Sequence, residues 1–143
     1  TYIHHYNLVN FHFMFSSTIR DVLTTANAKA FATNGIAGIN VVPVSMIRVN
    51  DDTIWLFDFF MDKTVQNLDV KAPVALTAWT DMKGIQIKAD AQYVTEGVEF
   101  MEAVAWVKEQ NPARVVKGLI ILTPTKIHDI SPGGAFLEND LSI

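Results

Sequence analysis

The chain has 143 residues, of which 50% are hydrophobic and 18% charged, and its formal net charge at pH 7 is -4. That length suits one domain with one core, and the excess of apolar residues predicts that some of them cover a subunit interface. The mild negative charge argues against nucleic-acid partners and anionic membranes. The absence of cysteine excludes disulfides, thiol nucleophiles and Cys-ligated metal sites.

No apolar run approaches the roughly 20 residues that a membrane-spanning helix needs, and the first residues lack the pattern of a secretory signal. We therefore expect a cytoplasmic protein that does not bind membranes. Residues 1–15 differ from the rest and are interpreted as a flexible leader or added extension, followed by one domain over 16–143. His4, His5 and His12 fall in that leader with no carboxylate among them, so no metal site is expected.

In the first half of the chain, a helix is predicted over 18–26, because Thr18 and Asp21 resemble a capping box and apolar residues follow at helical spacing. Two β-rich segments come next, separated by the turn formers Asn34, Gly35 and Gly38. They are interpreted as an antiparallel pair of strands over 28–33 and 39–49, with a third strand over 53–57.

In the second half, a short helix is predicted over 63–70, ended by Pro73. Strands are predicted over 74–79 and 85–94, and strict alternation in the latter assigns one face to the core. Thr95 is the expected N-cap of a helix to about residue 110. The last strand is predicted over 115–123, with a continuation over 126–130 after Pro124.

Five or six strands without a strand–helix alternation favour a mainly β (α+β) fold, an antiparallel split β-barrel with peripheral helices. The sequence contains no dinucleotide-binding, P-loop, zincin or hydrolase-elbow motif. Lys63 and Thr64 open a short predicted helix after a strand. An ammonium, a hydroxyl and free backbone N–H groups in that position can bind an anion such as a phosphate.

Several ordered segments resemble the pyridoxamine 5′-phosphate oxidase-like FMN-binding split barrel over about residues 16–130. They are N-V-V-P-V-S at 40–45, W-L-F at 55–57, M-D-K-T-V-Q-N-L at 61–68, A-P-V-A-L-T-A-W at 72–79 and G-I-Q-I-K-A at 84–89. The chain is also similar to the small bacterial FMN-binding proteins of that superfamily. The resemblance implies a homodimer that holds FMN at two equivalent sites, each completed by the other subunit.

The resemblance also implies which residues contact the cofactor. Lys63 and Thr64 would hold the FMN phosphate, and the ring would lie along one strand, with further contacts from two others. The cofactor-binding set is Val42, Pro43, Val44, Ser45, Leu56, Phe57, Lys63, Thr64 and Gln86. No catalytic acid or base is nominated, because the flavin itself carries redox chemistry.

The chain departs from true pyridoxamine-phosphate oxidases at two positions. Those enzymes carry an arginine and a second basic residue where this sequence has Val41 and Asp62, and no basic, aromatic block follows Ile130. We therefore expect an FMN-dependent oxidoreductase or electron carrier with an unknown small-molecule redox partner, and not a typical pyridoxamine-phosphate oxidase. The alternatives are the same fold binding deazaflavin F420 or haem, or a cofactor-free dimeric binding module.

Overall fold

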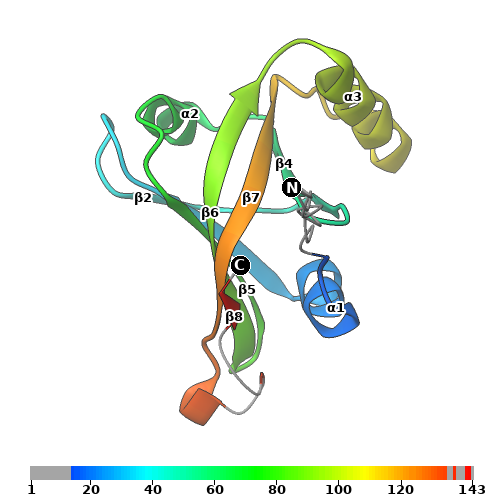
Figure 1. Cartoon of the computed structure of the whole chain (residues 1–143). Helices are drawn as coiled ribbons and strands as arrows, with labels where there is room; N and C mark the ends of the chain where they lie inside the picture. The colour runs from blue at the N-terminus through cyan, green and yellow to red at the C-terminus, as the bar shows by residue number, and fades with distance from the viewer. Residues whose placement is uncertain (1–13, 135–136, 138–140, 143) are drawn as a thin grey trace, which may run out of the picture.

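The computed structural model describes residues 14–134, 137 and 141–142, and their main feature is one strongly curled antiparallel sheet (Figure 1). The sheet has the strand order β2-β1-β5-β6-β7-β4-β3, and β8 adds to β7. The strands are β1 (Ala28–Thr33), β2 (Asn40–Pro43), β3 (Ile47–Val49), β4 (Ile54–Asp58), β5 (Val74–Thr80), β6 (Lys83–Val94), β7 (Gly118–Asp129) and β8 (Leu141–Ser142).

Three helices lie around this sheet: α1 (Ser17–Thr25), α2 (Asp62–Leu68) and α3 (Val98–Gln110), followed by the short 3-10 helix η1 (Pro132–Gly134). In Figure 1 they sit at separate corners, with α2 beside β2 and α3 beyond the upper ends of β6 and β7. The predicted split barrel with peripheral helices is confirmed. None of the helices in the described part of the chain has both the length and the hydrophobicity that crossing a bilayer requires.

The core follows from the alternation of side chains along each strand. On β6, Ile85, Ile87 and Ala89 are fully buried, as their spacing predicts, while Lys88 and Asp90 are exposed. Aligned inner-face residues of adjacent strands form the interior of the barrel, including Phe31, Leu76, Ile87 and Ile127. A second cluster, between β4, β7 and α3, is built on Trp55, Phe57, Ala103, Val107 and Leu119.

The predicted single strand over 39–49 is wrong, because the structure divides it into β2 and β3. β2 pairs with β1, whereas β3 pairs with β4 at the opposite edge of the sheet. Pro43 has no N–H to donate, and Val44 makes a last backbone bond to Lys29 O (2.9 Å) before the chain leaves β1. Since residues 44–46 join the two edges of the sheet, the sheet has to curl.

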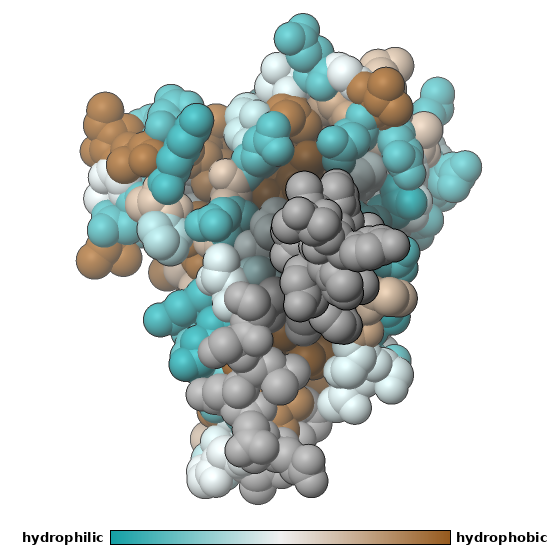
Figure 2. Space-filling model, viewed as in Figure 1, coloured by the Kyte–Doolittle hydropathy of each residue, from teal (hydrophilic) through white to brown (hydrophobic). Residues whose placement is uncertain are grey.

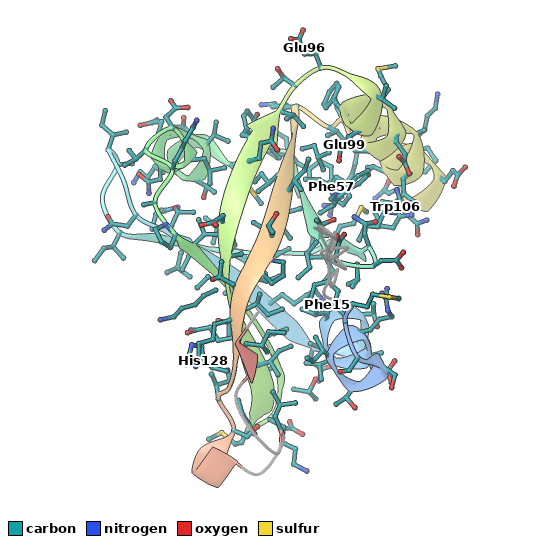
Figure 3. All side chains as sticks on the ribbon, viewed as in Figure 1. Phe15, Phe57, Glu96, Glu99, Trp106 and His128 are labelled. Atoms are coloured by element: carbon teal, nitrogen blue, oxygen red, sulfur yellow. The ribbon has the colours of Figure 1, made fainter. Side chains whose placement is uncertain are left out.

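The predicted helix caps are also corrected. α1 is capped by the Ser16 hydroxyl, which accepts from Ile19 N (3.3 Å), and not by a capping box on Thr18. Gly97, with φ of 95°, replaces Thr95 as the N-cap of α3, and a positive φ favours glycine. Phe15, the last residue of the predicted leader, is buried beside α1 (Figure 3), whereas residues 1–13 lie outside the described residues.

The sequence predicts two strands, over 115–123 and 126–130, whereas the structure has one continuous strand, β7. β7 runs through Pro124, and the register with β6 shifts at that point: Lys88 faces Lys126 but Ala89 faces Pro124. Thr125 is therefore the extra residue of a β-bulge, where a proline is tolerated. The segment from 115 to 117 instead leads from α3 into the sheet.

Gly118 lies directly under the Tyr93 ring, and a Cβ at this position would overlap the ring. We expect Gly118→Ala to lower the free energy of unfolding by about 1–3 kcal/mol, the cost of overpacking a rigid site. Urea unfolding measures this cost. In a Tyr93→Leu background, which removes the ring, the penalty of Gly118→Ala should largely disappear. An equal penalty in both backgrounds would contradict the packing argument.

Candidate functional site

Helix α2 is held against the β1–β2 connection by a buried amide. The Asn67 side chain donates to Thr33 Oγ1 (3.0 Å) and Gly38 O (2.7 Å), and accepts from Ala37 N (2.8 Å). A Cβ on Gly35 would come within 2.8 Å of the Asn67 backbone, so this close approach requires a glycine. The sequence reasoning missed Asn67, whose partners lie 29 to 34 residues away.

The turn that leads from β4 into α2 is shaped by a second buried polar group. Asp58 is 5% exposed, and its carboxylate accepts from Met61 N (2.8 Å) and from the Tyr93 hydroxyl (2.7 Å). Burial raises the pKa of Tyr93 above its ordinary value, and the hydrogen bond and negative charge of Asp58 raise it further. Because Tyr93 belongs to β6, its hydrogen bond to Asp58 holds the turn against that strand.

A groove of about 300 Å³ lies where the chain crosses from β2 to β3. One wall is the crossing segment itself, and the other is formed by the aromatic turn after β4. Its lining is mostly apolar, and no Asp or Glu is part of it. The residues that line it are Val42, Pro43, Val44, Ser45, Met46, Phe57, Phe59, Phe60, Met61 and Arg114.

The aromatic wall is backed by α3. Phe57 stacks on Trp106 with ring centroids 5.3 Å apart and on Phe59 at 6.3 Å, and Figure 3 shows Phe57 and Trp106 together between β4 and α3. Phe60 projects from this wall with 89% of its surface exposed. The groove therefore combines a rigid aromatic base with an apolar side chain open to solvent.

One polar group of the groove was missed by the sequence reasoning. Arg114 donates from its guanidinium to Ser45 Oγ (2.8 Å) and lies over the Phe59 ring, 4.8 Å from its centroid. It follows α3 in the chain and is 69 residues from Ser45. No local pattern indicates this pairing, because only the packing of α3 beside β4 brings the two segments together.

The five predicted residues Val42 to Ser45 and Phe57 meet in the groove, but Lys63 and Thr64 do not line it. They lie at the other end of β2, where Asn40 Nδ2 donates to Thr64 Oγ1 (3.0 Å). Thr64 is fully buried and Lys63 is exposed. Since five residues of extended chain span roughly 16 Å, Ser45 and Asn40 mark two ends of an elongated region.

Two other predicted residues lie apart from the groove. Leu56 is fully buried in the interior of the barrel. Gln86 lies on the outer face of the sheet, where its amide is 3.5 Å from Thr77 Oγ1. Across the sheet, Gln86 of β6 is aligned with Thr77 of β5, Ala30 of β1 and Pro43 of β2. Two strands, β1 and β5, therefore lie between Gln86 and the strand that lines the groove.

No group of three or more His, Asp or Glu residues arranged to hold a metal ion occurs within the described ranges. His4, His5 and His12 lie outside the described residues. His128 stands on the outer face of β7 opposite Gln86 (Figure 3).

Comparison with protein families gives a match to the model described as pyridoxamine 5′-phosphate oxidase, over residues 15–131. The chain belongs to the pyridoxamine 5′-phosphate oxidase-like family. The curled sheet and the predicted FMN-binding split-barrel architecture agree with this membership. None of the curated proteins compared with the chain matches it.

Solved structures with the same fold include HupZ of Group A Streptococcus, with a TM-score of 0.74 and 20% identity over 85% of this chain and 98% of HupZ. An FMN-binding protein from Syntrophomonas wolfei aligns with a TM-score of 0.68 and 20% identity, over 80% of this chain and 84% of that one. HutZ, a haem storage protein from Vibrio cholerae, aligns at 0.59 and 18%, over 74% and 87%. At these identities the likeness establishes the fold.

Because folding raises the pKa of Tyr93, the free energy of unfolding should decrease as the pH rises into the alkaline range. Because the folded state holds the phenolic proton more tightly than the unfolded chain does, Tyr93 stabilises the fold fully below about pH 10 and progressively less above it. Tyr93→Phe should lose about 1.5–3 kcal/mol at neutral pH, the value of one hydrogen bond to a charged group. Its stability should then fall less steeply than that of the wild type above about pH 10.

Urea unfolding of both proteins at about pH 8 and about pH 11 checks this expectation. Tyr2 and Tyr6 are present in both proteins, so their ionisation cancels in the comparison. Parallel losses of stability over this range would show that Tyr93 is not the group responsible.

Proposed function

We propose that this protein binds FMN and acts as a flavin-dependent oxidoreductase or electron carrier. The observation that carries the proposal is the groove along residues 42–46, formed in part by β2, whose first residue Asn40 donates a hydrogen bond to Thr64 beside Lys63. Family membership and the FMN-binding protein from Syntrophomonas wolfei support the same cofactor. In this proposal the protein is cytoplasmic, consistent with a cysteine-free sequence.

The residues present fit the two chemically different parts of FMN. The apolar groove against Phe57 and Phe59 suits a planar ring system. At the other end, no carboxylate among the described residues lies within 4 Å of the Lys63 ammonium, which leaves its charge available to a phosphate. Thr64 Oγ1 accepts from Asn40, so its own O–H remains a donor, although a phosphate would reach it only after a local adjustment because the side chain is buried.

When bound, FMN would supply the redox chemistry, and the protein would hold, orient and shield it. Val41 is an exposed apolar residue, and Asp62 is a carboxylate that accepts from Gln66 Nε2 (3.1 Å). True pyridoxamine-phosphate oxidases carry basic residues at these two positions. We therefore infer that the protein binds phosphate with modest affinity, and that its reaction is not pyridoxamine-phosphate oxidation. No residue is assigned as a catalytic acid or base.

Haem is the second candidate, since the haem storage protein HutZ shares the fold. Deazaflavin F420 and a cofactor-free binding module are the remaining alternatives. The absorbance spectrum of the purified protein separates these cases, because flavins absorb in the blue and fluoresce green whereas haem gives an intense Soret band. A protein that carries no chromophore and takes up none of the three would favour the binding module.

We also infer a homodimer, which the outer face of the sheet supports. Neighbouring strands align small side chains there, and Ala30, Ala32, Ala75 and Thr77 are only partly covered within one chain. Val41 extends the face and is 61% exposed. Figure 2 shows apolar side chains at the adjoining edge, over the β1–β2 connection, where Ile36 and Ile39 are exposed. A second copy would remove this surface from water.

Lys63→Ala should weaken FMN binding by about 1.5–3 kcal/mol, the range of a charge-assisted hydrogen bond. Quenching of flavin fluorescence during a titration measures the affinity. Lys108→Ala, which removes the same charge from the exposed last turn of α3, is the matched control and should bind FMN as the wild type does. Equal affinity in all three proteins would remove Lys63 from the site.

Ala30→Glu should convert the dimer to a monomer, because it places a charge in the middle of the outer face. Light scattering after size-exclusion chromatography should give twice the chain mass of 15.9 kDa for the wild type and a single chain mass for the variant. Ala105→Glu introduces the same side chain on the exposed side of α3 and should remain dimeric. A wild type that is monomeric at all concentrations would contradict the inference.

A further inference from the structure

We propose that Arg114 and Ser45 form an anion-binding site that receives a carboxylate on a planar, aromatic small molecule. The inference rests on the proposed function, since this molecule would be the partner that the bound FMN acts on. The site lies at the β3 end of the groove, where the Arg114 guanidinium donates to Ser45 Oγ (2.8 Å).

No carboxylate in the described part of the chain neutralises the charge of Arg114. Among the described residues no carboxylate lies within 4 Å of its guanidinium, although Arg48 pairs with Glu102 at 3.1 Å elsewhere on the surface. A guanidinium has five N–H donors, and Ser45 uses one of them. Donors therefore remain for a carboxylate, which a guanidinium can bind through two parallel hydrogen bonds.

The guanidinium is also held in place before any ligand arrives. One face lies 4.8 Å from the Phe59 centroid, and Phe59 in turn stacks on Phe57. The hydrogen bond to Ser45 fixes the direction of one N–H group. A cation restrained in this way loses less conformational freedom on binding than a free surface arginine does.

The position of Arg114 argues for a second molecule rather than for the FMN phosphate. Lys63 and Thr64 lie beside Asn40, five residues and roughly 16 Å of extended chain before Ser45. In the proposed arrangement the phosphate is bound at Lys63, beside the first residue of β2, and Arg114 binds a different anion beyond the last residue of that strand. Arg114, which has no carboxylate partner among the described residues, is left for an anion that does not belong to that phosphate.

The surroundings indicate that the anion is attached to an apolar, flat body. Arg114 lines both the 300 Å³ groove and a second hollow of about 470 Å³, whose other lining residues are Phe59, Phe60, Ala113, Val115 and Lys117. No Asp or Glu lines either hollow, and the Lys117 ammonium lies 5.0 Å from the Phe60 centroid. Asp58 and Asp62 line a third hollow, which shares Phe60 and Met61 with the groove.

Benzoate and benzamide are suitable probes, because they share a planar shape and differ in charge. Each is titrated by calorimetry into the wild-type protein as purified, and into Arg114→Gln and Lys108→Gln. FMN affinity and the urea midpoint are measured for the same three proteins. We expect the wild type and Lys108→Gln to bind benzoate roughly tenfold more tightly than benzamide, and Arg114→Gln to show no preference.

Two results would overturn the inference while leaving the FMN proposal intact. One is FMN binding by the wild type together with a benzoate preference that Arg114→Gln does not change. The other is a loss of FMN affinity in Arg114→Gln as large as that in Lys63→Ala, which would place Arg114 on the cofactor. If the wild type binds no FMN, the proposed function fails, and with it the assignment of the anion to a redox partner.

Discussion

The groove depends on one backbone constraint, the crossing of residues 44–46 from one edge of the sheet to the other. Val44 N still bonds to Lys29 O (2.9 Å), whereas Ile47 already pairs with Leu56. Pro43 cannot donate to a neighbouring strand, so the ladder of β2 ends there. Beyond Val44 the crossing segment has no neighbouring strand until Ile47, and it lines the groove opposite the aromatic turn after β4.

Buried polar groups then place α2 relative to that crossing. Asn67 joins the helix to the β1–β2 connection, and Thr64 joins it to Asn40. Removing one partner of such a bond leaves a buried group without water or protein to bond to, which costs more than the bond contributes. Because these bonds reach the β1–β2 connection and the first residue of β2, the position of Lys63 is coupled to the strand that forms the groove wall.

Local patterns predicted most elements and only part of the candidate site. The alternation of apolar and polar residues over 85–94 predicted which face of β6 lies in the core, since every second side chain of a strand points inward. Between residues 39 and 49 the same hydrophobic pattern continues, but only tertiary pairing decides where β2 ends and β3 begins. Asn67 and Arg114 have partners 29 to 69 residues away, so no short window contains their signal.

Charge is distributed unevenly along the elongated region that runs from Lys63 to Arg114. At the α2 end, the ammonium of Lys63 has the carboxylate of Asp62 as its neighbour in the chain, whereas the groove around Arg114 is free of acidic side chains. Arg114 is exposed like Lys63, but its guanidinium is oriented by Ser45 and by the Phe59 ring. With Val41 and Asp62 in place of basic residues, we infer that Arg114 contributes more to anion binding than the α2 end does. A protein arranged in this way would select its small-molecule partner more by that partner's anionic group than by affinity for the phosphate of its cofactor.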